Sequence, residues 1–151
     1  MKKLLSLFVA IFATTALWAF DFVGDNFLCY NITSSSEPYT VQVTCQVSFS
    51  SENYYGISSF TIPTAVEHNG ITYAVTGIDD RAFLNCFALK SITIPEGITN
   101  IGTIAFENCK ALTSITIPNS VTNIGQSAFG NDSSLTSITI GKGVINIGSR
   151  A

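Results

Sequence analysis

The chain has 151 residues, enough for one domain with a sizeable core. Only 11% of the residues are charged and the formal net charge is −3, whereas 17 Ser and 17 Thr residues supply most of the polar side chains. This balance argues against a basic nucleic-acid-binding surface and against a charged disordered chain, and the single histidine, His68, excludes any site that needs two.

The N-terminus has the features of an export signal. Lys2 and Lys3 precede an uncharged run, 4–20, in which an apolar stretch is followed by smaller residues. We expect cleavage after Ala19, so that residues 1–19 are a signal peptide and the mature chain has no stable membrane span. Because a span needs about 20 apolar residues, an uncleaved anchor is the less favoured alternative. The signal predicts a secreted or cell-surface protein.

Residues 20–58 are predicted to form an N-terminal β cap. Residues 40–49 alternate between apolar and polar side chains, which is typical of a strand with one buried face, and residues 27–32 offer a partner strand. Cys29 and Cys45 fall on these two strands. An oxidising compartment permits a disulfide between them, but the register is not set by the sequence, so both states stay open.

A variant first coil follows the cap. Residues 59–63 read Ser-Phe-Thr-Ile-Pro, the strand pattern that recurs later in the chain. The next core position comes nine residues later than in the regular units. The extra residues contain Asn69-Gly70 between apolar stretches, which predicts a hairpin with a tight turn.

Three segments then align without gaps at a constant period of 23. They begin at Leu89, Leu112 and Leu135, and each contains Ser-Ile-Thr-Ile, which predicts strands over 91–94, 114–117 and 137–140. Ala-Phe pairs keep the same spacing and indicate short helical turns or irregular coil on the opposite side. One unit has too few apolar side chains to fold alone, so the units must stack.

The repeated pattern Ile-Gly-x-x-Ala-Phe-x-Asn-Cys-x-x-Leu-x-Ser-Ile-Thr-Ile-Pro resembles the BspA-like (Treponema pallidum type) leucine-rich repeats of bacterial surface proteins. The resemblance covers residues 59–151. It implies a mostly β fold with short helical turns, namely a leucine-rich-repeat solenoid with an N-terminal β cap, preceded by a signal peptide. Because the sequence stops inside the motif, we expect a longer array, the alternative being a natural end covered by a partner.

Residues that could carry chemistry have structural explanations. Cys86 and Cys109 take the same position in successive coils, and parallel stacking aims both sulfurs the same way, so we expect buried, reduced cysteines. His68 could be combined with a serine and Asp79 or Asp80, but nothing in their spacing indicates a triad. We therefore expect no enzyme, no metal site and no cofactor.

Other recurring residues are predicted at turns. The recurring glycines are expected to be corner residues, and the recurring asparagines are expected to bond to nearby backbone. These positions are Gly102, Gly125 and Gly148; Asn85, Asn108 and Asn131; and Asn100, Asn123 and Asn146.

The outward strand face is the candidate partner-binding surface. It consists of Ser91, Thr93, Ser114, Thr116, Ser137 and Thr139. These hydroxyls either only solvate the sheet or form a weakly charged contact surface for a host or matrix protein or a glycan; Tyr54 and Tyr55 in the cap are alternative anchors.

Two functions stay open. The first is an exported binding module for adhesion or recognition, the class that the resemblance implies. The second is a rigid spacer or cap of a larger secreted or surface protein. No nucleic-acid partner is expected, and no feature of the sequence indicates an oligomeric state.

Overall fold

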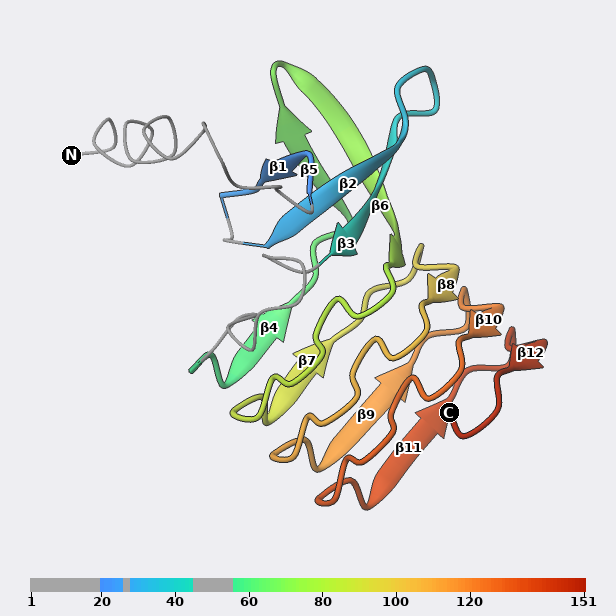
Figure 1. Ribbon diagram of the computed structural model, residues 1–151. Coiled ribbons are helices and arrows are strands. Elements are labelled where there is room, and N and C mark those ends of the chain that lie inside the picture. Colours follow the sequence, from blue (N-terminus) through green and yellow to red (C-terminus); the bar gives the residue numbers. More distant parts are fainter. Residues whose placement is uncertain (1–19, 26–27, 45–55) are drawn as a thin grey trace.

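The computed structural model describes residues 20–25, 28–44 and 56–151, and the elements in these ranges are all strands. A small antiparallel cap is followed by stacked coils (Figure 1). In the described ranges, no helix is long and apolar enough to cross a membrane. The predicted signal peptide lies outside these ranges, as do Cys45, Tyr54 and Tyr55.

The cap is built on a β-hairpin. Strands β2 (Cys29–Ser34) and β3 (Thr40–Thr44) pair antiparallel, and β1 (Phe22–Val23) adds to the free side of β2. The expected pairing of these two segments is therefore observed. Val41 and Val43 are fully buried, because alternate residues of β3 face the core.

The first coil contains the predicted hairpin. After β4 (Ser59–Thr61), strand β5 (Ala65–His68) turns back into β6 (Ile71–Ile78). Asn69 and Gly70 form the turn with φ of 52° and 76°, the left-handed pair that a two-residue hairpin loop requires. Strand β6 also runs parallel to β3, so it joins the cap to the coils.

The predicted repeat strands form one side of the stack. They are β7 (Ser91–Thr93), β9 (Ser114–Ile117) and β11 (Ser137–Ile140), with β4 beside β7 and β9 beside β11 in parallel ladders. Ile92 and Ile115 are buried, and Ile138 lies directly beside Ile115. Because β7 also contacts β9, the three isoleucines form the expected file, which is internal at Ile92 and Ile115 and exposed at Ile138.

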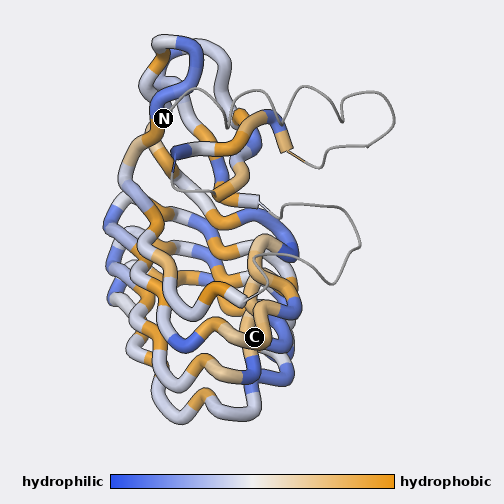
Figure 2. Tube along the Cα trace, turned by 90° about the vertical axis from the view of Figure 1, so that its left-hand side faces the viewer, coloured by the Kyte–Doolittle hydropathy of each residue, from blue (hydrophilic) through white to orange (hydrophobic). Residues whose placement is uncertain are grey.

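A second row of short strands was not predicted. Strands β8 (Asn100–Ile101), β10 (Asn123–Ile124) and β12 (Asn146–Ile147) run parallel and extend the cap sheet through β6. Figure 2 shows the coils as successive levels with hydrophobic stretches recurring along them. The prediction that Asn100, Asn123 and Asn146 lie at turns is wrong, since they begin these strands.

The Ala-Phe segments are turns, and no helix occurs there. Of the two alternatives, irregular coil is therefore observed. Each turn bonds to the next coil: the Phe83 N–H donates to the Ala105 carbonyl at 2.7 Å, and the Phe106 N–H donates to the Ala128 carbonyl at 2.8 Å. Asparagine suits these turns because it tolerates positive φ, as at Asn85 (61°).

The recurring glycines allow close approach between coils. A Cβ placed on Gly125 would lie 2.5 Å from the carbonyl carbon of Gly102, and one on Gly102 would lie 2.5 Å from the backbone nitrogen of Asp80. Neither glycine has positive φ. Their role is therefore steric contact between neighbouring coils, not the special backbone conformation of a corner.

Gly125→Ala should lower the free energy of unfolding by about 2–3 kcal/mol, because the new methyl group overlaps backbone atoms of the preceding coil. The matched control is Gly130→Ala in the same coil, whose Cβ would come no closer than 3.3 Å to its nearest neighbour. The control should change the free energy by less than about 1 kcal/mol. Urea unfolding measures both, and equal stability of the two variants would contradict the steric role.

Candidate interaction surface

The outward face of the repeat strands carries two columns of hydroxyl groups. The side chains of all six predicted site residues, Ser91, Thr93, Ser114, Thr116, Ser137 and Thr139, are exposed. The ladders place Ser91 beside Ser59 and Thr139 beside Thr116, so each column runs across the strands. Adjacent strands lie about 4.8 Å apart, which sets the step between neighbouring hydroxyls where the strands are paired.

This face is uniform and uncharged. Each strand presents a serine at its first position and a threonine at its third, including Ser59 and Thr61 of β4. The intervening residues, Phe60, Ile92 and Ile115, alternate with the exposed hydroxyls, because successive side chains of a strand point to opposite faces. The outward residues of these described strands therefore offer hydrogen-bond donors and acceptors with methyl groups, and none of them is aromatic.

The residues that follow the repeat strands form hydrogen bonds between coils. The sequence did not reveal these bonds. The Glu96 carboxylate accepts hydrogen bonds from the backbone N–H groups of Asn119 (3.2 Å) and Ser120 (2.9 Å). The Asn119 side chain in turn accepts from the Lys142 N–H at 2.9 Å. The N–H donors of Asn119 and Ser120 lower the pKa of Glu96 below its usual 4.5. The only signal of these bonds in the sequence is that Glu96, Asn119 and Lys142 follow one another at the repeat spacing of 23.

The recurring asparagines form ladders between coils. The Asn108 side-chain amide donates to the side-chain oxygen of Asn85 at 3.0 Å, and Asn146 donates likewise to Asn123 at 2.7 Å. The sequence predicted bonds to nearby backbone, whereas the acceptors of Asn108 and Asn146 lie one coil away. Asn123 donates instead to the hydroxyl of the adjacent Thr122 at 2.9 Å. The amides of Asn108 and Asn146 therefore hold the stack together.

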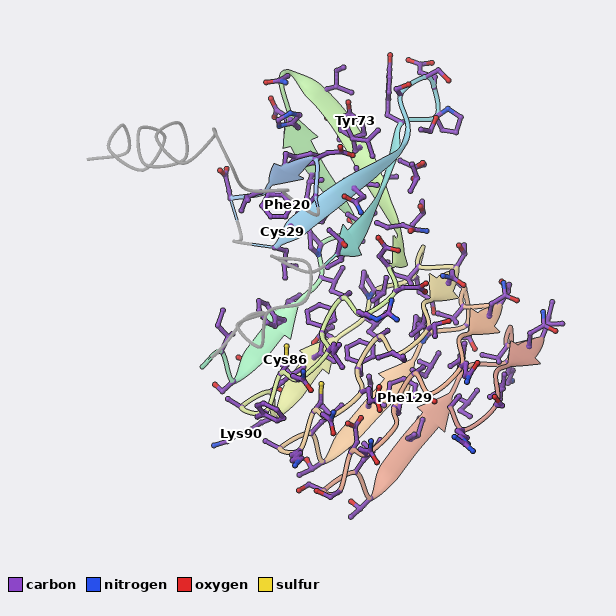
Figure 3. The ribbon with its side chains drawn as sticks, in the orientation of Figure 1. Phe20, Cys29, Tyr73, Cys86, Lys90 and Phe129 are labelled. Atoms are coloured by element: carbon purple, nitrogen blue, oxygen red, sulfur yellow. The ribbon has the colours of Figure 1, made fainter. Side chains whose placement is uncertain are left out.

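The buried cysteines lie inside the coils. Cys86 and Cys109 are buried thiols, which confirms the expected reduced state, and the Cys109 thiol donates to the Phe83 carbonyl at 3.3 Å. Figure 3 shows Cys86 in the turn that precedes β7. The pKa of the Cys109 thiol is raised far above its usual range, mainly by a hydrogen bond with Cys86 and to a smaller extent by burial. Both states of the Cys29–Cys45 pair stay open, since Cys45 lies outside the described residues.

His68, Asp79 and Asp80, for which the sequence indicated no triad, lie in structural contacts. The His68 ring stacks on Phe22 with centroids 4.2 Å apart. The Asp79 carboxylate accepts from the side chain of Asn31, and the Asp80 carboxylate accepts from the Thr103 N–H at 2.7 Å. Among the described residues, no group of three His, Cys, Asp or Glu side chains could hold a metal ion.

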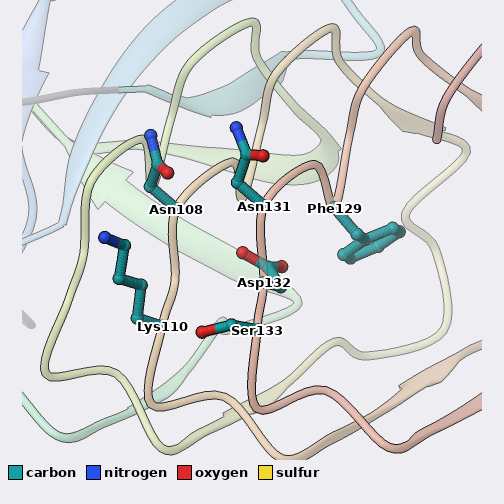
Figure 4. A pocket seen from close by; sticks show the side chains of 6 residues that line it. All are labelled: Asn108, Lys110, Phe129, Asn131, Asp132 and Ser133. Atoms are coloured by element: carbon teal, nitrogen blue, oxygen red, sulfur yellow. The ribbon is translucent and has the colours of Figure 1, made fainter.

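A shallow depression lies on the turn side of the stack. It has a volume of about 590 Å³, and its lining combines amide, ammonium, carboxylate and hydroxyl groups with one phenylalanine (Figure 4). The lining residues are Asn108, Lys110, Phe129, Asn131, Asp132 and Ser133. The sequence did not identify this feature, because its residues come from two adjacent coils.

Known proteins share this repeat pattern and this fold. The family model described as BspA type leucine rich repeat region (6 copies) matches residues 59–151. A leucine-rich repeat protein from Bacteroides ovatus is 27% identical over 85% of this chain and 37% of its own, with a TM-score of 0.53. The T. pallidum leucine rich repeat protein TpLRR is 21% identical over 86% of this chain and 65% of its own, with a TM-score of 0.61.

A third solved structure, the pneumococcal vaccine antigen PcpA, is 23% identical over 86% of this chain and 40% of its own, with a TM-score of 0.57. The chain thus spans less than two thirds of the length of each of these three structures. At their low sequence identities, the likenesses to TpLRR and PcpA show the fold alone. No curated protein matches the sequence.

Glu96→Gln should make stability less dependent on pH in the acid range. Because the folded-state pKa of Glu96 is lowered, its contribution is present above the unfolded value of 4.5 and is lost as the pH falls through the folded value. Wild type should therefore be the more stable protein near neutrality, with the difference shrinking on acidification. Urea midpoints across a pH series measure this, and Glu67→Gln at an exposed position of β5 is the charge-matched control. A pH-independent difference would contradict the expectation.

Proposed function

The chain belongs to the family of BspA-type leucine-rich repeat proteins, and on this premise we propose that it is an exported, surface-associated binding module. It recognises a protein or a glycan through the exposed hydroxyl face of β4, β7, β9 and β11, and its biological role is adhesion. Export is supported by the predicted signal peptide at residues 1–19. We propose no catalytic role for this chain.

The uniformity of the hydroxyl face is the observation that carries this proposal. Buried isoleucines set the inward positions of the strands, but solvation alone does not require the same outward residue in every coil. A Ser-x-Thr row nevertheless recurs on β4, β7, β9 and β11. A partner that fits one row can make the same contacts with the next if it also repeats along the stack. This favours extended partners such as a glycan chain or an extended segment of a matrix protein.

The absence of aromatic and arginine side chains from these rows favours a second function. Protein interfaces are usually anchored by Trp, Tyr or Arg, which the six outward residues do not supply. A chain without such anchors can act as a rigid spacer or cap that presents another domain of a larger secreted or surface protein. In that case, changes on the hydroxyl face would leave partner binding by the whole protein unchanged.

Substitution of the threonine column distinguishes the two functions. The triple variant Thr93→Glu, Thr116→Glu and Thr139→Glu should abolish retention on immobilised matrix proteins (fibronectin and fibrinogen) or glycans, because it places three charges in the contact surface. The triple Thr→Val variant keeps the side-chain shape and should weaken retention about tenfold or more, since each lost hydrogen bond contributes about 0.5–1.5 kcal/mol.

The control carries three new charges at exposed positions away from this face: Ser36→Glu, Gln126→Glu and Ser149→Glu. It should bind as wild type does. Circular dichroism and the urea midpoint of each variant report whether the stack is intact. Unchanged retention of a bound partner by both folded threonine variants would overturn recognition through the hydroxyl face.

A further inference from the structure

Asp132 interrupts a column of buried cysteines. Cys86 in the first coil and Cys109 in the second are followed, at the equivalent position of the third coil, by an aspartate. The Cys109 thiol donates a hydrogen bond to the Phe83 carbonyl at 3.3 Å. A thiol can donate in this way, and so can a carboxylic acid, but an ionised carboxylate can only accept.

The two oxygens of Asp132 have different surroundings. Oδ1 accepts a hydrogen bond from the Cys109 N–H at 2.7 Å, which ties the third coil to the second. Oδ2 is shielded from solvent and has no hydrogen-bond partner. An unsatisfied buried oxygen costs free energy, and the cost is larger when the group carries a charge. The geometry therefore favours the neutral acid.

Three ionisable groups of the second coil lie near Asp132. Glu107 and the Cys109 thiol face it from the second coil, and Lys110 lines the same depression (Figure 4). Burial raises the pKa of Asp132 to about 7, the Cys109 N–H opposes this rise, and the negative charge of Glu107 adds to it.

We propose that Asp132 makes the junction between the second and third coils pH-sensitive: the junction is most stable when the carboxyl group is protonated, and it is destabilised when ionisation places charge on the buried, unpartnered Oδ2. The folded chain then holds a proton on Asp132 that the unfolded chain has lost. The contribution of this group to stability is fully present below the ordinary pKa of 3.8 and is lost as the pH rises through about 7.

A carboxyl titration of the full wild-type chain by NMR tests the protonation state directly and needs no variant. The Asp132 carboxyl signal should titrate at least about two pH units above the usual aspartate value near 3.9. Glu107→Gln should move this midpoint downward, since it removes a nearby negative charge. A midpoint near the usual value would overturn the proposal.

Unfolding in urea between about pH 5 and pH 8 tests the consequence for stability. The unfolding equilibrium constant of wild type relative to Asp132→Asn should rise several-fold per pH unit up to about pH 7, below the tenfold ceiling for one proton, and then level off. Asp132→Cys, which restores the column of cysteines, should lose the pH dependence that Asp132 contributes, as Asp132→Asn does. The ratio of wild type to Asp132→Cys should therefore rise with pH in the same way. Constant ratios for both variants across this range would also overturn the proposal.

Discussion

The fold depends on placing each residue directly beside its equivalent in the next coil. The rings of Phe83, Phe106 and Phe129 follow one another at 5.1 and 5.4 Å with interplanar angles of 3° and 4°, and such stacked pairs contribute about 0.5–1.5 kcal/mol each beyond burial. Backbone bonds and asparagine ladders keep the same step. The extra residues of the first coil form the β5–β6 hairpin, and the end of β6 at Gly77 and Ile78 stays in register with β8.

Burial in this molecule is supplied by the neighbouring coils. Ile115 lies within the stack and is 4% exposed, whereas the equivalent Ile138 on the last strand of its row is 41% exposed. Ile124 and Ile147 differ in the same way, at 5% and 58%. The coil that follows therefore adds substantially to the shielding of an inward side chain, so stability grows with each coil added.

Much of the fold could be predicted, because two periods are legible in the sequence. A period of two predicts the strands and their exposed hydroxyls, a period of 23 predicts the stack, and Asn69-Gly70 predicts the hairpin. The strands at Asn100–Ile101 and its equivalents are only two residues long and leave no alternation to detect. The bonds of Glu96 and the orphaned oxygen of Asp132 depend on which coil lies beside them, which only the three-dimensional structure shows. The hydroxyl face was predictable as a surface, but a uniform surface encodes little about its ligand.

Strand β6 has a consequence for the order in which the molecule is assembled. It pairs with β5, with β3 of the cap and with β8 of the second coil, so the cap and the stack share one sheet. The cap thus supplies a finished template on which the first coil can nucleate, which a free coil lacks. Since synthesis proceeds from the N-terminus, the template is made before the coils that grow on it. Assembly then has a direction, and each new winding adds to an edge already in place.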